Sequence, residues 1–135
     1  MPIKISELDH IVLNVSDIHR SLDFYTRVLG LSGERVEQFN AGTVGFPSVR
    51  INPRTIIDLF PAKRVAPGSG EKHNGNLNHF CLVVNADDFP GAIDCLRENQ
   101  IAIREGPVSR WGAQGKATSI YFLDPDGNEI EIRCY

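Results

Sequence analysis

The sequence lacks a long apolar run and a large charge of either sign, and its first residues predict no secretory leader; each of these features argues against a class of protein. No apolar stretch approaches the roughly 18 residues that a membrane-spanning helix needs. The net charge is -3, so a broad basic surface for nucleic acid is not expected. Residues 1–5 have no secretory apolar core. We therefore expect a cytoplasmic protein without membrane or nucleic-acid partners.

Cysteine is also scarce. The three cysteines, Cys81, Cys95 and Cys134, are odd in number and form no Cys-x-x-Cys pair. Neither a disulfide framework nor a thiolate zinc site is therefore expected, and reduced thiols are typical of a cytosolic protein. Because Cys81 and Cys95 lie in apolar segments, we interpret them as packing residues rather than nucleophiles.

The chain does contain an internal repeat. Its 135 residues, of which 41% are hydrophobic and 23% charged, are typical of one globular domain. Residues 8–15 (LDHIVLNV) and 77–84 (LNHFCLVV) both begin with Leu, a polar residue and His, followed by an apolar run. Both runs are short and rich in β-branched residues, which predicts two equivalent strands about 70 residues apart.

A helix is predicted after each of these strands. The first begins at residues 16–17, a Ser-Asp pair that can cap a helix, and ends at Gly30. The second begins at residues 87–88 and has Pro90 in its first turn, where a missing N–H does no harm. The apolar positions with helical spacing are Ile18, Leu22, Tyr25 and Leu29 in the first helix and Phe89, Ile93 and Leu96 in the second.

Each half continues as strands, so the chain is predicted to be an α+β protein of two tandem βαβββ modules. The predicted strands are residues 33–39, 43–51 and 55–60 in the first half and 103–108, 117–123 and 129–135 in the second. The single domain, 1–135, then divides into module 1 (about 5–60), a connector (about 61–75) and module 2 (about 76–135). Neither module can close a core alone, so we expect both to form a curved mixed sheet around a cleft.

Four polar residues occupy matching positions in the two halves. They are His10 with His79 and Asp58 with Glu131, and each carboxylate lies in an apolar strand. Two imidazoles and two carboxylates are a suitable ligand set for a divalent ion of Fe, Mn, Ni, Co or Zn. Because strands hold their side chains rigidly, these four residues are candidates for one metal site.

Each of the four also has a purely structural interpretation. A histidine at the start of a strand can be a hydrogen-bonded structural residue, and Glu131 can belong to the solvated face of an alternating strand. Asp58 has apolar neighbours, and burial without a partner would be costly, so a salt bridge to an arginine such as Arg50 is its structural alternative. The remaining histidines have no repeat counterpart. We interpret His19 as a helix-surface residue and His73 as part of the connector.

Residues 8–31 (LDHIVLNVSDIHRSLDFYTRVLGL) and 119–132 (SIYFLDPDGNEIEI) resemble the opening and closing segments of vicinal oxygen chelate proteins. That superfamily includes glyoxalase I, extradiol ring-cleaving dioxygenases, fosfomycin-resistance enzymes and bleomycin-binding proteins. Its shared chemistry is a metal that stabilises negative charge on two neighbouring substrate oxygens. The resemblance implies a metal-dependent enzyme, either a lyase or isomerase or a ring-cleaving dioxygenase. The alternatives are a metal-free module that binds a small molecule or drug, and a fold with a vestigial site.

The resemblance also implies roles for the matched residues. His10, His79 and Glu131 match the two-histidine, one-carboxylate metal ligands of extradiol dioxygenases. A fourth carboxylate at the position of Asp58 resembles bacterial glyoxalase I, where it is usually glutamate. Because Asp58 is one methylene shorter, its role as a fourth ligand stays open. A metal-bound Glu131 could also leave the metal and act as a base, which makes it the candidate catalytic residue.

Further residues are expected to form the wall of the site. Residues 106–116 are glycine-rich and too long for a tight hairpin, so we expect a loop from which Arg110 and Trp111 contact an anionic or aromatic substrate. Trp111 can instead pack on a dimer partner or a sheet edge. Phe60 and Tyr121 are candidates for either the pocket lining or the core. By resemblance, we expect a homodimer that binds a small-molecule substrate.

Overall fold

The computed structural model describes residues 7–61, 77–112 and 114–135, without the side chains of residues 111 and 112. The chain divides into two compact units, Met1–Lys63 and Arg64–Tyr135. Apart from residue 61, the predicted connector, with His73, lies outside the described residues.

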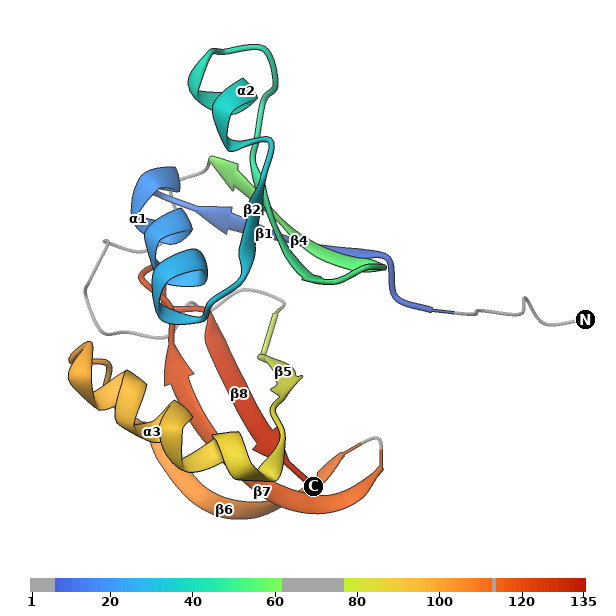
Figure 1. Ribbon diagram of the computed structural model, residues 1–135, viewed down its shortest axis with the longest axis vertical. Helices are drawn as coiled ribbons and strands as arrows, with labels where there is room; N and C mark the ends of the chain where they lie inside the picture. The colour runs from blue at the N-terminus through green and yellow to red at the C-terminus, as the bar shows by residue number, and fades with distance from the viewer. Residues whose placement is uncertain (1–6, 62–76, 113) are drawn as a thin grey trace, which may run out of the picture. The chain divides into compact units, whose positions relative to one another are not determined.

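The first unit contains a four-stranded mixed sheet (Figure 1). Its elements are β1 (His10–Val15), α1 (Ile18–Asp23), the π-helix η1 (Phe24–Val28), β2 (Ser32–Glu34), α2 (Val36–Asn40), β3 (Ser48–Asn52) and β4 (Thr55–Pro61). Strand β1 runs parallel to β4, and β3 pairs antiparallel with both β4 and β2. The strand order is therefore β1-β4-β3-β2.

The second unit repeats this topology. Its elements are β5 (Phe80–Val83), the 3-10 helix η2 (Ala86–Asp88), α3 (Phe89–Glu98), β6 (Glu105–Gly112), β7 (Gly115–Leu123) and β8 (Glu129–Cys134). Strand β5 runs parallel to β8, β7 pairs antiparallel with β8 and β6, and the order is β5-β8-β7-β6. The predicted fold class of two βαβββ modules is confirmed.

The local signals for the two helices are also confirmed. The Asp17 side chain accepts a hydrogen bond from the Arg20 N–H at 3.0 Å and so caps α1. That helix continues as η1, and Gly30 follows with a φ of 73°, which glycine adopts without strain. Pro90 lies in the first turn of α3. In the described part of the chain, no helix is long and apolar enough to span a membrane.

The strand predicted at residues 33–39 is wrong beyond Glu34. Arg35 adopts a left-handed conformation, with φ 57° and ψ 23°, which turns the chain out of the sheet and into α2. The residue type gave no sign of this, because non-glycine residues in that region are most often Asn, Asp or His. The strand predicted at residues 43–51 consequently begins later, at Ser48.

The loop predicted at residues 106–116 is wrong as well. Strands β6 and β7 form a hairpin through this segment, with Arg110 opposite Ala117 and Gly112 opposite Gly115. Gly115 has a φ of 103°, so a glycine that suggested a loop instead allows the chain to enter β7. Figure 1 shows the two strands curving together along their length.

The strands of each unit bury apolar residues on one face, and the other face of β8 in the second unit carries the polar residues Glu129, Glu131 and Arg133. In β7 and β8, the fully buried Ile120, Phe122 and Ile130 alternate with polar residues, because successive side chains of a strand point to opposite faces. The helices add the buried residues Ile18, Leu22 and Tyr25 in the first unit and Phe89 and Leu96 in the second. In β4 of the first unit the corresponding face is mixed, because Asp58 shares it with Ile56 and Phe60. The polar side chains on these faces are the candidates for a functional site.

This assignment of faces is tested on strand β8. Replacing Ile130 by alanine should lower the free energy of unfolding by about 2–5 kcal/mol, because a fully buried isoleucine leaves a cavity. The control Glu129→Ala, on the opposite face of the same strand, should lower it by less than about 1 kcal/mol. Urea denaturation followed by circular dichroism measures both, and equal losses would contradict the assignment.

Candidate functional site

Each unit holds one histidine beside one buried carboxylate. In the second unit, His79 Nε2 lies 3.3 Å from Glu131 Oε2. In the first unit, His10 Nε2 lies 3.9 Å from Asp58 Oδ2. Asp58 is 6% exposed and Glu131 is 3% exposed. The interpretation of Glu131 as part of a solvated face is therefore wrong.

The parallel strand pairs bring each histidine to its carboxylate. In the first unit, Val12 is opposite Asp58, and His10 shares their face because it lies two residues before Val12. The second unit repeats this register, with Cys81 opposite Glu131. The site therefore follows from the same pairing of the first and last strands in both halves.

The two nitrogen-to-oxygen distances differ in whether both atoms could bind the same metal ion. Two ligand atoms about 2.1 Å from one ion lie about 3.0–3.4 Å apart at octahedral to tetrahedral angles. The 3.3 Å between His79 Nε2 and Glu131 Oε2 falls within that interval, whereas the 3.9 Å in the first unit does not. His79 and Glu131 thus fit two ligands of one ion. Among the described residues of either unit, no group of three or more His, Cys, Asp or Glu side chains could hold an ion.

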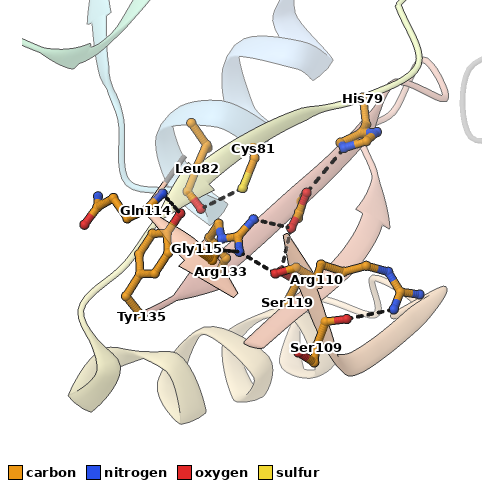
Figure 2. Close-up of polar contacts among 11 residues, drawn as sticks. His79, Cys81, Leu82, Ser109, Arg110, Gln114, Gly115, Ser119, Arg133 and Tyr135 are labelled. Atoms are coloured by element: carbon orange, nitrogen blue, oxygen red, sulfur yellow. Dashed lines mark hydrogen bonds and ion pairs between the residues drawn. The ribbon is translucent and has the colours of Figure 1, made fainter. Parts of the chain in front are cut away.

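A serine and an arginine hold the other oxygen of Glu131. Figure 2 shows Ser119 and Arg133 turned toward the carboxylate that His79 also faces. Ser119 Oγ donates to Glu131 Oε1 at 2.5 Å, and Arg133 Nη1 lies 3.5 Å from the same oxygen. Arg133 is itself 4% exposed and donates to the Arg110 carbonyl at 2.8 Å. Glu131 Oε2 is the oxygen that remains directed at the imidazole.

The first unit has the same arrangement, with an arginine from a different element. Ser48 Oγ donates to Asp58 Oδ1 at 2.5 Å, and Arg35 Nη2 lies 3.5 Å from that oxygen. Arg35 also donates to the Ser48 hydroxyl. The arginine that the sequence suggested for this role, Arg50, instead pairs with Glu34. Each carboxylate thus has one oxygen held and one oxygen facing a histidine.

The other nitrogen of each imidazole is also engaged. Asp9 Oδ2 lies 2.7 Å from His10 Nδ1, and Asn78 Oδ1 lies 2.7 Å from His79 Nδ1. The hydrogen bond to Asp9 raises the pKa of His10 above its usual value, against a smaller opposing effect of desolvation. Nε2 is therefore the nitrogen that each histidine directs toward its carboxylate.

Tyr121 lies beside the pair in the second unit. Its ring centroid is 5.7 Å from that of His79, edge to face, and the residue is 8% exposed. Burial raises the pKa of its phenol, and the negative charge of Glu131 adds to that effect. Tyr121 also lines a pocket of about 320 Å³ together with Arg104, Glu105 and Glu129.

The other residues predicted to line the site either make contacts apart from the His79–Glu131 pair or lie outside the described side chains. Phe60, in the first unit, is 37% exposed and packs its ring 4.5 Å from that of Phe46. Arg110, in the second unit, pairs with Glu105. The side chain of Trp111 lies outside the described residues.

The sequence did not reveal the serines and arginines around the carboxylates. Ser48 and Ser119 occupy matching places in the two halves, each directly before a fully buried residue, so the repeat contained a signal for them. The two arginines carry no such signal, because they come from elements that do not correspond in the repeat. Arg35 directly precedes helix α2, whereas Arg133 lies in strand β8.

Cys81 is exposed, which contradicts its interpretation as a packing residue. Desolvation of its sulfur raises the pKa of the thiol to about 11, and the charge of Glu131 acts in the same direction. A thiol with so high a pKa is a poor nucleophile at neutral pH. The other part of the interpretation, that Cys81 is no nucleophile, agrees with this environment.

Comparison with known proteins identifies the family. A family model described as the Glyoxalase/Bleomycin resistance protein/Dioxygenase superfamily matches residues 7–132. The chain therefore belongs to this superfamily, as the resemblance of its two end segments implies.

Several proteins are similar over nearly the whole chain. The glyoxalase domain-containing protein RDO1 of Mycosarcoma maydis is 37% identical over 135 residues, 98% of this chain and 70% of that protein. The virulence protein STM3117 of Salmonella typhimurium is 37% identical over 133 residues, 97% of this chain and 85% of that protein. The metallothiol transferase FosB of Staphylococcus epidermidis is 29% identical over 133 residues, 96% of this chain and 82% of that protein.

Solved structures share the fold. A protein from the mobile metagenome of V. Pseudocholerae has a TM-score of 0.75 at 34% identity, covering 100% of this chain and 98% of that one. A variant of the fosfomycin resistance protein FosX from Listeria monocytogenes, complexed with Mn(II) and 1S,2S-dihydroxypropylphosphonic acid, has a TM-score of 0.73 at 18% identity. The aligned region covers 97% of this chain and 93% of the FosX chain, and at this identity it shows the fold alone.

The bond between Ser119 and Glu131 is tested by Ser119→Ala. The substitution leaves a buried carboxylate oxygen without its 2.5 Å donor, so the free energy of unfolding should fall by about 1–3 kcal/mol. The control Thr118→Ala, an exposed neighbour on the same strand, should change it by less than about 0.5 kcal/mol. Urea denaturation at neutral pH compares the two variants. A Ser119→Ala protein as stable as the control would be inconsistent with this bond.

The raised pKa predicts that Cys81 alkylates slowly despite its exposure. At pH 8.5 an ordinary thiol is about half ionised, whereas a pKa of about 11 leaves only about 0.3% thiolate. Iodoacetamide should therefore modify Cys81 at least about tenfold more slowly than it modifies free cysteine, because only the thiolate reacts. Mass spectrometry of the Cys81 peptide over time measures the rate. A rate equal to that of free cysteine would show that the thiol has an ordinary pKa.

Proposed function

We propose that this protein is a divalent-metal-dependent enzyme acting on a small substrate that binds the metal through two neighbouring oxygens. In this proposal His10, His79 and Glu131 are the metal ligands. The observation that carries it is the 3.3 Å between His79 Nε2 and Glu131 Oε2, with the second oxygen of the carboxylate held by Ser119. A carboxylate fixed in this way needs little reorganisation to bind an ion.

His10 enters the proposal through the repeat. It occupies in the first unit the position that His79 has in the second, and its Nδ1 is engaged in the same way. Two imidazoles and one carboxylate are suitable ligands for Fe, Mn, Ni, Co or Zn as divalent ions. Because the FosX structure contains Mn(II), manganese is the first ion to test.

Asp58 is proposed to be a structural partner rather than a fourth ligand. Its Oδ1 is held by Ser48 and lies 3.5 Å from Arg35, and its Oδ2 is 3.9 Å from His10 Nε2. Ligation would require the shorter aspartate side chain to move while it keeps its buried partners. Three protein ligands leave coordination positions open for two substrate oxygens.

A metal in this site would polarise the substrate oxygens and stabilise the negative charge that develops on them. This chemistry suits transfer of a nucleophile to the substrate, isomerisation or elimination, and oxidative ring cleavage. The similarity to FosB, which is named a metallothiol transferase, favours transfer of a nucleophile. The compound bound to FosX carries hydroxyls on neighbouring carbons, the kind of substrate group that the proposal requires.

The remaining roles follow from position. Tyr121 is proposed to contact the bound substrate, because its ring packs against His79 and it lines a pocket. Phe60 and Arg110 are proposed to contact parts of the substrate that lie farther from the metal. Glu131 is proposed mainly as a fixed ligand, since action as a base on leaving the metal would disturb its bond to Ser119. A homodimer in the cytoplasm remains the proposal that the family resemblance supports.

The proposal predicts metal binding that depends on three residues. Purified protein should bind Mn(II), and His10→Ala, His79→Ala and Glu131→Gln should each weaken binding by more than about 100-fold, because each removes a ligand. The matched control is His19→Ala, which removes an exposed histidine from α1 and should leave the affinity unchanged. Isothermal titration calorimetry, with metal content by mass spectrometry, measures both.

The result also separates the classes of function. Full metal occupancy surviving His10→Ala and Glu131→Gln would rule out the proposed site. Tight binding of a planar drug by metal-free protein, with no metal-dependent reaction, would instead favour a binding module. With metal bound, thiol-adduct formation, isomerisation and oxygen consumption distinguish the three reaction classes.

A further inference from the structure

The residue before each histidine accepts a hydrogen bond from its ring. Asp9 Oδ2 lies 2.7 Å from His10 Nδ1, and Asn78 Oδ1 lies 2.7 Å from His79 Nδ1. The two contacts have the same length, and each joins the ring Nδ1 to a side-chain oxygen of the preceding residue, at equivalent positions of the repeat. A chance surface contact would not be expected to recur in this way.

The chemistry of these oxygens determines where the imidazole proton lies. A carboxylate oxygen or an amide carbonyl oxygen can only accept a hydrogen bond, so Nδ1 must be the donor in both rings. In a neutral imidazole the second nitrogen then carries a lone pair. That nitrogen is Nε2, the one directed at the carboxylate in each unit.

The competing oxygens on the Nε2 side are farther away. Asp58 Oδ2 is 3.9 Å from His10 Nε2, and Glu131 Oε2 is 3.3 Å from His79 Nε2. Both distances exceed the 2.7 Å on the Nδ1 side. Since a hydrogen bond weakens with length, the shorter contact favours the proton on Nδ1. At His10 both acceptors are carboxylates, whereas at His79 a near amide oxygen competes with a more distant carboxylate, so His79 is the more stringent test.

Stability does not account for these contacts. The side chain of Asp9 is 85% exposed and that of His10 is 47% exposed, so water competes for the same groups. Free histidine prefers the opposite arrangement, with its proton on Nε2. A hydrogen bond that adds little to folding can still select the less common tautomer and the orientation of the ring.

We infer that Asp9 and Asn78 are positioning residues that keep the proton of His10 and His79 on Nδ1 and so present Nε2 to a metal ion. The placement of the proton is a property of the metal-free protein. Its consequence for metal binding rests on the function proposed above. The two residues also differ, because Asp9 is charged and Asn78 is neutral. A carboxylate partner increases the ability of the His10 Nε2 lone pair to bind a metal ion more than a neutral amide does for His79. Changes at Asp9 should therefore have the larger effect on metal affinity.

The first measurement uses 15N-labelled, metal-free protein. Long-range 1H–15N spectra of the imidazoles, recorded at a pH where all rings are neutral, show which nitrogen carries the proton. His10 and His79 should be protonated on Nδ1, whereas His19, on the surface of α1, serves as the reference with its proton on Nε2. Wild-type protein with the proton on Nε2 in His10 and His79 would overturn the inference.

The second measurement uses paired variants. Asp9→Leu and Asn78→Leu keep similar side-chain sizes without an acceptor, and each should move the proton of its own histidine to Nε2. The conservative variants Asp9→Asn and Asn78→Asp keep an acceptor and should retain the proton on Nδ1. If the leucine variants keep Nδ1 protonated, Asp9 and Asn78 have no positioning role.

Metal affinity supplies the functional readout. The leucine variants should bind Mn(II) about 10–100-fold more weakly, as is usual when the hydrogen-bond partner of a ligating histidine is lost. Asp9→Asn should restore most of the loss, and the control Asp94→Leu, on the exposed surface of α3, should have none. If wild-type protein binds no metal but shows the expected tautomers, the proposed function fails and the inference about the proton stands. Normal affinity in both leucine variants would contradict the inferred role in metal binding.

Discussion

The hydrogen bond from Ser119 to Glu131, with Arg133 beside it, is the interaction on which the site depends. Glu131 is 3% exposed, and a carboxylate so deeply buried is tolerated only when it is paired and hydrogen-bonded. The bond occupies Oε1. Oε2 therefore faces the imidazole, 3.3 Å from His79 Nε2. The pairing that makes burial possible also gives the carboxylate a defined direction.

The two units share the same strand pairing and the same serine-to-carboxylate hydrogen bond, but the carboxylate side chain is one methylene longer in the second unit. In both units the first strand runs parallel to the last, and a serine on the neighbouring antiparallel strand donates to the carboxylate at 2.5 Å. The longer glutamate reaches to 3.3 Å from its imidazole, whereas the aspartate remains at 3.9 Å. This difference supports a ligand role for Glu131 and a structural role for Asp58.

Much of the fold was predictable because repeat, strand alternation and helix capping are local signals. The matching positions of the repeat predicted the two strand–helix–strand modules, and they also singled out His10, His79, Asp58 and Glu131 as candidates for one site. Prediction from the sequence failed at α2, because Arg35 adopts a left-handed conformation that its residue type does not indicate. It also failed at β6–β7, because a glycine-rich segment can form a hairpin as well as a loop. The arginines beside the carboxylates were missed, because their contacts depend on a three-dimensional arrangement that differs between the halves.

The central claim is that each buried carboxylate offers a single oxygen. The direct test is a crystal structure of the protein loaded with Mn(II), with the ion located by anomalous scattering. The account predicts an ion bound to His79 Nε2 and to Glu131 through Oε2 alone, with Ser119 still donating to Oε1 and His10 as the third protein ligand. An ion bound elsewhere, or bound to both oxygens of Glu131 with the Ser119 bond broken, would contradict it.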